Sequence, residues 1–255
     1  MPQGRTICWF SCGAASAVAA KLMLNEISDA LVVYCDTGAE HDDNKRFMAD
    51  CANWLGVEIK TIKSPNFSST WEVWEKRKYL ASPFGAPCTS ELKVAPRLDF
   101  QLPSDTHVFG YTADGGDVRR ANRMLETYTD MKQRHPLIER GITKSACLAM
   151  LQTAGIEPPI TYQMGFPNAN CIPCVKATSP SYWALVRKEA PVEFERMREL
   201  SRRLNVRLAQ LKGERVFIDE IPLDHPTTSP IAPACDFLCH MAEQEMEGND
   251  NGTAQ

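Results

Sequence analysis

The sequence lacks any apolar run that approaches the roughly 20 residues needed to cross a bilayer. Its N-terminus also lacks the basic-then-apolar pattern and small-residue cleavage site of a secretory signal. No internal repeat is visible, and no sign of charge dominates, because 28 basic residues face 32 acidic ones for a net charge of -4. These absences argue against membrane insertion, secretion and binding to nucleic acid by bulk charge. We expect a cytoplasmic protein with no membrane partner.

What the chain does contain is enough apolar material for a full core. With 255 residues, of which 44% are hydrophobic, it fits one large α/β domain with room for a small appendage. Ten cysteines are present. In a reducing compartment they are not expected to form a disulfide framework, so each is core filler, a metal ligand or a reactive thiol.

The first 24 residues have the pattern of strand, tight loop and helix. Residues 6–10 are apolar and β-prone, residues 11–16 are small, and residues 17–24 are rich in helix formers. Small residues let the backbone approach a ligand, and the amides at a helix start favour phosphate. An ordinary small-residue turn would show the same pattern.

Strands and helices then alternate. Residues 31–35, 57–62, 106–111 and 135–138 have strand patterns, and residues 43–55 have a helical one. The alternation predicts an α/β fold with a parallel, five-stranded, doubly wound sheet. Ligands of such sheets bind at the carboxyl ends of the strands, here strands one, two and four.

The C-terminal part has a mainly helical pattern. We expect helices over residues 143–153 and 179–203, the latter interrupted at Pro191, and an edge strand over residues 215–221. The predicted organisation is one nucleotide-binding α/β domain, a helical extension packed on it, and a disordered polar tail. Their ranges are residues 1–176, 177–242 and 243–255.

A Cys-x-x-Cys pair, Cys171 and Cys174, lies in a turn-forming loop, and Cys88 lies in a proline- and glycine-rich loop far upstream. Two thiols three positions apart can grip one metal centre. Soft thiolate sites take zinc or iron-sulfur clusters, and the residues alone do not separate them from each other or from a metal-free loop. Four other cysteines have the pattern of buried core residues. These are Cys8, Cys35, Cys51 and Cys147.

Four motifs in this order resemble the PAPS reductase family of the adenine nucleotide alpha hydrolase (PP-loop) superfamily. The cysteines resemble its iron-sulfur branch, and the stretch from His135 to Trp183 is similar to small PAPS reductase-like proteins common on phage and plasmid genomes. The motifs are Ser11-x-Gly13-x-x-Ser16, Asp36-Thr37-Gly38-x-Glu40, Cys88-x-x-x-x-Lys93-x-x-Pro96 and Gly165-Phe166-x-x-x-x-Cys171-x-x-Cys174.

The resemblance implies that the chain binds an adenine nucleotide, namely ATP, APS or PAPS, with magnesium as a further candidate. The phosphate loop departs from the family pattern, because its second glycine and its magnesium-binding aspartate are missing, which weakens the case for adenylation. Arg119 and Arg120 could equally be solvent-exposed residues of a helix with no role in nucleotide binding. The nucleotide-binding residues that follow are Ser11, Gly13, Ser16, Asp36, Gly38, Gly110, Arg119 and Arg120.

The resemblance also implies a 4Fe-4S cluster held by Cys88, Cys171 and Cys174. Iron-sulfur APS reductases have a Cys-Cys pair where this chain has Pro87 before Cys88, which leaves the fourth position unassigned. It is either an open iron site, as in cluster-dependent tRNA thiolation enzymes, or it is filled from the C-terminus. The two C-terminal candidates are Cys235 and Cys239.

The function implied is adenine-nucleotide-dependent sulfur chemistry, either sulfur transfer or sulfur removal on an unidentified nucleic-acid or small-molecule acceptor. One alternative is an APS or PAPS reductase that forms sulfite, with Cys239 or Cys235 as catalytic thiol and a thioredoxin-like reductant. Leu238-Cys239-His240 only partly matches the reductase motif Glu-Cys-Gly-x-His. Another alternative is a non-catalytic sensor that binds nucleotide or cluster.

Overall fold

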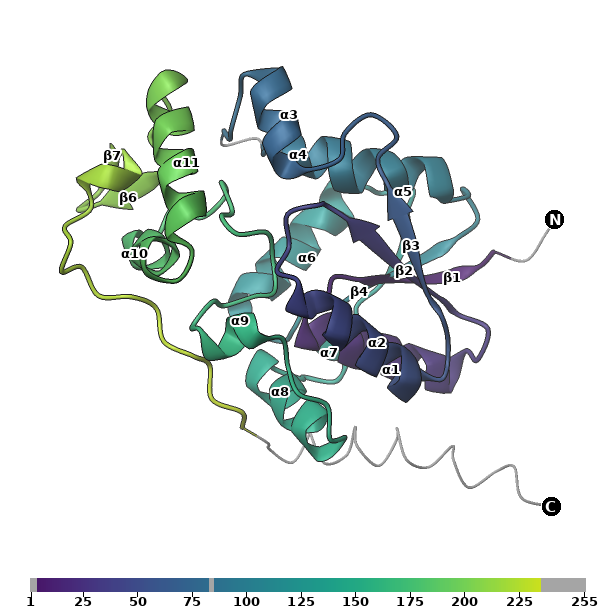
Figure 1. Cartoon of the computed structure of the whole chain (residues 1–255). Coiled ribbons are helices and arrows are strands. Elements are labelled where there is room, and N and C mark those ends of the chain that lie inside the picture. The colour runs from purple at the N-terminus through teal and green to yellow at the C-terminus, as the bar shows by residue number, and fades with distance from the viewer. Residues whose placement is uncertain (1–3, 83–84, 235–255) are drawn as a thin grey trace, which may run out of the picture.

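The computed structural model describes residues 4–82 and 85–234, which form an α/β fold around a five-stranded sheet (Figure 1). The strand order is β3-β2-β1-β4-β5, and every neighbouring pair is parallel. The predicted fold class is therefore confirmed. The strands are β1 Thr6–Phe10, β2 Leu31–Asp36, β3 Ile59–Lys63, β4 Thr106–Phe109 and β5 Lys132–Arg134.

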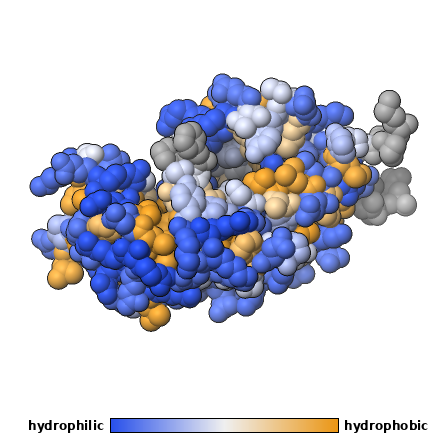
Figure 2. All heavy atoms as spheres, turned by 90° about the horizontal axis from the view of Figure 1, so that it is seen from above, coloured by the Kyte–Doolittle hydropathy of each residue, from blue (hydrophilic) through white to orange (hydrophobic). Residues whose placement is uncertain are grey.

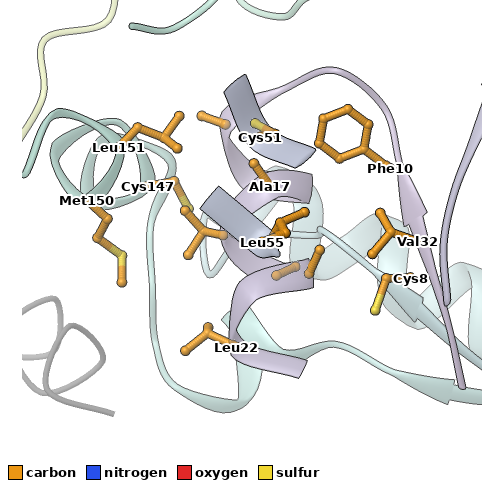
Figure 3. Close-up of a cluster of buried hydrophobic side chains, with 14 of the residues drawn as sticks. Cys8, Phe10, Ala17, Leu22, Val32, Cys51, Leu55, Cys147, Met150 and Leu151 are labelled. Carbon is orange, nitrogen blue, oxygen red and sulfur yellow. The ribbon is translucent and has the colours of Figure 1, made fainter. Parts of the chain in front are cut away.

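One face of the sheet packs on helices that share the larger apolar core (Figure 3). Successive side chains of a strand point to opposite faces, and Cys8 and Phe10 of β1 turn to this side. They meet the buried small residues of α1, which allow that helix to lie close to the sheet. The helices on this face are α1 Ala14–Glu26, α2 Asp43–Leu55, α7 Pro136–Glu139 and α8 Lys144–Thr153.

The opposite face is covered by a helical layer that includes a π turn. Trp9 of β1 points to this side, where its ring lies 6.3 Å from that of Phe100. Three short segments run without a break from Pro87 to Phe100, and such π turns are frequent at functional sites. The elements of this layer are α3 Thr70–Arg77, α4 Pro87–Thr89, η1 Ser90–Val94, α5 Ala95–Phe100 and α6 Gly115–Thr127.

A second apolar cluster joins the C-terminal elements to the cysteine loop. Its largest fully buried side chains are Trp74 and Trp183. On the face that Figure 2 shows, hydrophobic residues lie in separate patches between hydrophilic ones. None of the helices in residues 4–82 and 85–234 is long and apolar enough to span a membrane. The C-terminal elements are α9 Ile160–Gln163, α10 Pro180–Glu189, α11 Pro191–Arg203, β6 Ala209–Leu211, β7 Glu214–Val216 and η2 Ile218–Glu220.

Two predicted strands are wrong. Residues 135–138 do not form the last strand: β5 precedes them, and Pro136 begins α7, because its fixed φ suits a first helical turn. Residues 215–221 do not form an edge strand of the sheet. There β7 pairs with β6 in a separate antiparallel hairpin and a 3-10 turn follows. The predicted tail, residues 243–255, lies outside the described residues.

Candidate functional site

A cavity of about 430 Å³ lies at the carboxyl ends of β1, β2 and β4. We call it the strand-end cavity. It lies where the sequence predicts a nucleotide, and its volume falls within the range of small-molecule sites, roughly 300–1,000 Å³. Its lining includes Trp9, Ser11, Ser16, Tyr34, Cys35, Thr89, Lys93, Arg97, Phe109, Gly110, Tyr111 and Tyr128.

The loop between β1 and α1 is closed by its own serines. The amide of Ser11 donates to Ser16 Oγ at 3.0 Å, and Ser16 Oγ donates to the Gly13 carbonyl at 2.9 Å. Cys12 takes a left-handed φ of 54° and its side chain is buried. The first amides of a helix have no acceptor within the helix. The Ala14 amide donates to Tyr162 Oη at 3.3 Å, and the next amides of α1, beside Ser16 at the cavity, suit an anion.

Gly110 lines the cavity and also lets α1 approach the end of β4. A Cβ at this position would lie 2.7 Å from Cα of Ser16 and 2.9 Å from the carbonyl carbon of Ala15. The glycine therefore sets the spacing between the strand and the helix start. The family resemblance implied that Gly110 binds the nucleotide, and the structure adds this close approach to the α1 backbone.

The helical wall of the cavity carries Thr89, Lys93 and Arg97, each four residues from the next. Lys93 Nζ lies 3.9 Å from Glu40 Oε1. Burial lowers the pKa of Lys93, but nearby acidic groups, first of all the Glu40 carboxylate, raise it more, so its pKa lies above the usual value. Lys93, which lies between the strand-end cavity and the thiols of the cysteine loop, thus favours its protonated, positively charged form.

Glu40 is the centre of a buried polar network. Its carboxylate accepts hydrogen bonds from Tyr34 Oη at 2.8 Å, Asn44 Nδ2 at 2.9 Å and Thr37 Oγ1 at 3.3 Å. Burial raises the pKa of Glu40, against the opposing effect of Lys93 and these hydrogen bonds. Thr37 Oγ1 also lies 2.9 Å from Cys171 Sγ, so the network links the end of β2 to the cysteine loop.

Asp36 and Gly38 line a different depression, of about 600 Å³, rather than the strand-end cavity. Asp36 pairs with Lys63 at 2.8 Å and accepts from the Gly38 amide at 2.9 Å. Gly38 has a φ of 61°, and a Cβ there would collide with the carbonyl oxygen of Ser68. Both residues shape the turn after β2.

The two predicted arginines are exposed on α6. Arg120 pairs with Asp117 at 3.2 Å and lines a third cavity, of about 380 Å³, which we call the thiol cavity. Arg119 lies next to it on the exposed side of the helix. The structure therefore does not bring these arginines together with Ser11 and Ser16.

Cys171 and Cys174 line the thiol cavity, and all three predicted ligand thiols are half-buried. Burial raises the pKa of Cys171 to about 12, although Lys93 works against it. Burial also raises the pKa of Cys88, against the indole N–H of Trp74. That N–H is buried and lacks an acceptor of normal geometry among the described residues. A thiolate at Cys88 would suit it.

The described residues nevertheless do not form a metal site. Residues 4–82 and 85–234 contain no group of three or more His, Cys, Asp or Glu side chains that could hold a metal ion. Cys235 and Cys239, the predicted fourth ligand or catalytic thiol, lie outside the described residues. As they are placed, Cys88, Cys171 and Cys174 do not surround a single metal ion.

The remaining predicted cysteines divide in two. Cys8, Cys51 and Cys147 are fully buried in the larger core, as expected for small hydrophobic residues (Figure 3). Cys35 differs, because it is half-buried and lines the strand-end cavity, with its Sγ 3.9 Å from the Lys93 carbonyl oxygen.

Sequence reasoning assigned no role to Lys93, Arg97 or Glu40. Lys93 and Glu40 stand in the motifs quoted above, and only the fold shows that they meet. Arg97 follows Lys93 by four residues, a spacing that places two side chains on one helical face. That spacing was the available signal.

The sequence model of the phosphoadenosine phosphosulfate reductase domain matches residues 5–177. Among solved structures, the chain is similar to the phosphoadenylyl-sulfate (PAPS) reductase from Candida auris in its phosphate complex. The two share 13% sequence identity with a TM-score of 0.49, over 67% of this chain and 82% of that one. The search of curated proteins gave no match.

Proposed function

We propose that the chain, which belongs to the phosphoadenosine phosphosulfate reductase domain family, binds an adenine nucleotide in the strand-end cavity and carries out sulfur chemistry beside it. One observation carries this proposal. A single cavity of about 430 Å³ combines the start of α1, aromatic rings and two cationic side chains at the carboxyl ends of three parallel strands.

Each wall has a role in this proposal. The amides at the start of α1, shaped by Ser11 and Ser16, bind phosphate oxygens. Phe109 and Tyr111 offer apolar rings to the nucleoside. Lys93 holds a positive charge between the nucleotide and the thiols of the Cys171 loop, where negative charge would develop during sulfur chemistry.

The cofactor and the acceptor are finer parts of the proposal. A 4Fe-4S cluster would take Cys88, Cys171 and Cys174 as ligands, with Cys235 or Cys239 as the fourth. It is supported by the family resemblance and by the unpartnered Trp74 N–H beside Cys88, and it requires the three thiols to rearrange. Magnesium has weaker support, because the loop carries Ala15 where relatives use an aspartate.

The direct test is purification of the full chain without oxygen, followed by analysis of the copurifying nucleotide, iron and acid-labile sulfide. We expect an adenine nucleotide, and iron with sulfide if the cluster proposal is right. Nucleotide without iron would remove the cluster and keep the nucleotide function. Failure of AMP, ATP, APS and PAPS to bind the purified chain would overturn the proposed function.

A sulfonucleotide assay separates reduction from sulfur transfer. Sulfite formation from APS or PAPS with thioredoxin, lost in Cys239→Ser or in Cys235→Ser, would assign the chain to reduction. Absence of sulfite with both substrates would leave transfer to, or removal from, a nucleic-acid or small-molecule acceptor. Nucleotide binding without any turnover would instead point to a sensor.

A further inference from the structure

Arg97 lines the strand-end cavity from the helical wall, on α5. Only 7% of its surface is exposed. Its guanidinium lies over the ring of Tyr128, 5.1 Å from the ring centroid, which fixes the side chain from one side. The helical wall and the start of α1 both border the same cavity, so Arg97 and Ser16 are lining residues of one space.

The charge of Arg97 has no counter-charge in the described part of the chain. Its Nε is buried and has no hydrogen-bond partner, and no carboxylate of residues 4–82 or 85–234 forms an ion pair with it. Lys93, one turn earlier on the same wall, has Glu40 at 3.9 Å. Lys93 therefore has an acidic partner within the protein, whereas Arg97 on the same wall has none among the described residues.

A buried charge is costly unless it is paired and hydrogen-bonded. An arginine held on an aromatic ring with its nitrogens beside a cavity is suited to a planar, two-pronged contact with phosphate or another oxyanion. The charge is also felt by Cys35, another lining residue, where it opposes the burial that raises the pKa of that thiol to about 11. The cavity is thus the place where a compensating anion would bind.

We propose that Arg97 binds an oxyanion of the bound nucleotide, from the wall that carries Lys93. This inference rests on the proposed function, since it needs a nucleotide in the strand-end cavity. It adds a second anion contact to the one at the start of α1. The oxyanion belongs either to the 5′ phosphate chain of the nucleotide or to a second phosphate on its ribose. The ligands used in the binding experiment below distinguish these two sources.

The test compares Arg97→Met with wild type and with Arg207→Met as matched control. Arg207 also stacks on an aromatic ring, at 4.8 Å over Phe217, but it is exposed and far along the chain in the C-terminal part. Titration calorimetry measures the affinity of each protein for adenosine, AMP and adenosine 3′,5′-bisphosphate. Thermal unfolding measures the melting temperature of each protein without ligand. Met keeps a long, unbranched apolar side chain and removes the charge and the hydrogen-bond donors.

We expect Arg97→Met to weaken binding of a phosphorylated ligand by roughly 10-fold to 100-fold, the range for a charge-assisted hydrogen bond. Adenosine should bind equally to all three proteins, and Arg97→Met without ligand should melt at the same or a higher temperature, because an unpaired buried charge is removed. If Arg97→Met loses affinity for AMP, Arg97 contacts the 5′ phosphate. If it loses affinity only for the bisphosphate, Arg97 contacts the second phosphate, on the ribose.

Equal affinity of wild type and Arg97→Met for every ligand would overturn the inference while leaving the proposed function intact. So would an equal loss for adenosine and AMP, or a lower melting temperature with unchanged affinities, because either result would mean a structural role. If wild type bound neither AMP nor the bisphosphate, this inference would be overturned, and the proposed function would fail with it only if ATP, APS and PAPS did not bind either.

Discussion

Two arginines at opposite ends of the sheet show how differently the fold treats one residue type. At the amino end, Arg5 pairs with the buried Asp105 at 2.6 Å and donates to the Phe100 carbonyl at 3.0 Å. At the carboxyl end, Arg97 is buried against Tyr128 without an acidic partner among the described residues. Both guanidinium groups lie over an aromatic ring, at 5.0 and 5.1 Å. The charge at the amino end is therefore neutralised within the protein, whereas the charge at the carboxyl end is suited to an anionic ligand.

Asp105→Asn should give the largest change, because Asp105 is 1% exposed and accepts from Arg5 and the Leu102 amide. We expect a loss of about 2–3 kcal/mol in the free energy of unfolding at neutral pH, measured in urea. Asp105→Asn as stable as wild type would mean that Arg5 is no better compensated than Arg97.

The same pair predicts a pH dependence. Burial opposes the charged form of Asp105, but hydrogen bonds from Arg5 and Leu102 outweigh it and hold the pKa of that carboxyl below its usual range. The contribution is therefore present above the ordinary aspartate pKa and is lost as pH falls through the lowered one. Wild type should lose more stability than Asp105→Asn on acidification below about pH 4.

Gly110→Ala tests the carboxyl end of the sheet. The new Cβ would press on the α1 backbone at Ser16, so we expect a loss of about 1–3 kcal/mol and weaker AMP binding. Gly116→Ala is the control, because no atom lies within 4 Å of a Cβ there. Calorimetry and urea unfolding measure both effects. If the two variants had the same stability and the same AMP affinity, Gly110 would have no role in the site.

Cys147→Ser and Cys88→Ser compare a core thiol with a site thiol. Cys147 is 0% exposed, so a buried hydroxyl should cost about 1–2 kcal/mol, while the half-buried Cys88 should tolerate the change with less loss. Urea unfolding of metal-free protein measures the difference. A larger loss at Cys88 than at Cys147 would make Cys88 a structural residue.

Arg120→Gln should give the smallest effect. Arg120 is exposed, pairs with Asp117 and lines the thiol cavity instead of the strand-end cavity. Because exposed ion pairs contribute little, we expect AMP affinity to change by less than about threefold. A tenfold loss in calorimetry would restore the role that the sequence suggested for this residue.

The sequence predicted the sheet well because its strands have long apolar or alternating patterns, as in residues 31–35. It misplaced β5 because Leu137 and Ile138 look like strand residues, while the true strand, Lys132–Arg134, is short and polar at the sheet edge. Local pattern cannot show which short segment reaches the edge, since neighbouring strands decide it.

For the candidate site, a motif pointed to Ser11 and Ser16, the family resemblance added Gly110, and the fold places all three at one cavity. Motifs did not separate these residues from Asp36 and Gly38, which line a different depression and shape the turn after β2. The four-residue spacing from Lys93 could have placed Arg97 on the same helical face, but its burial without a partner is a property of tertiary structure that spacing does not reveal.

A crystal structure of the full chain with AMP would show whether an adenine nucleotide binds in the strand-end cavity. We expect the phosphate at the start of α1 beside Ser11 and Ser16, with the nucleoside between Phe109, Tyr111 and the helical wall. AMP bound outside the residues that line this cavity would contradict it.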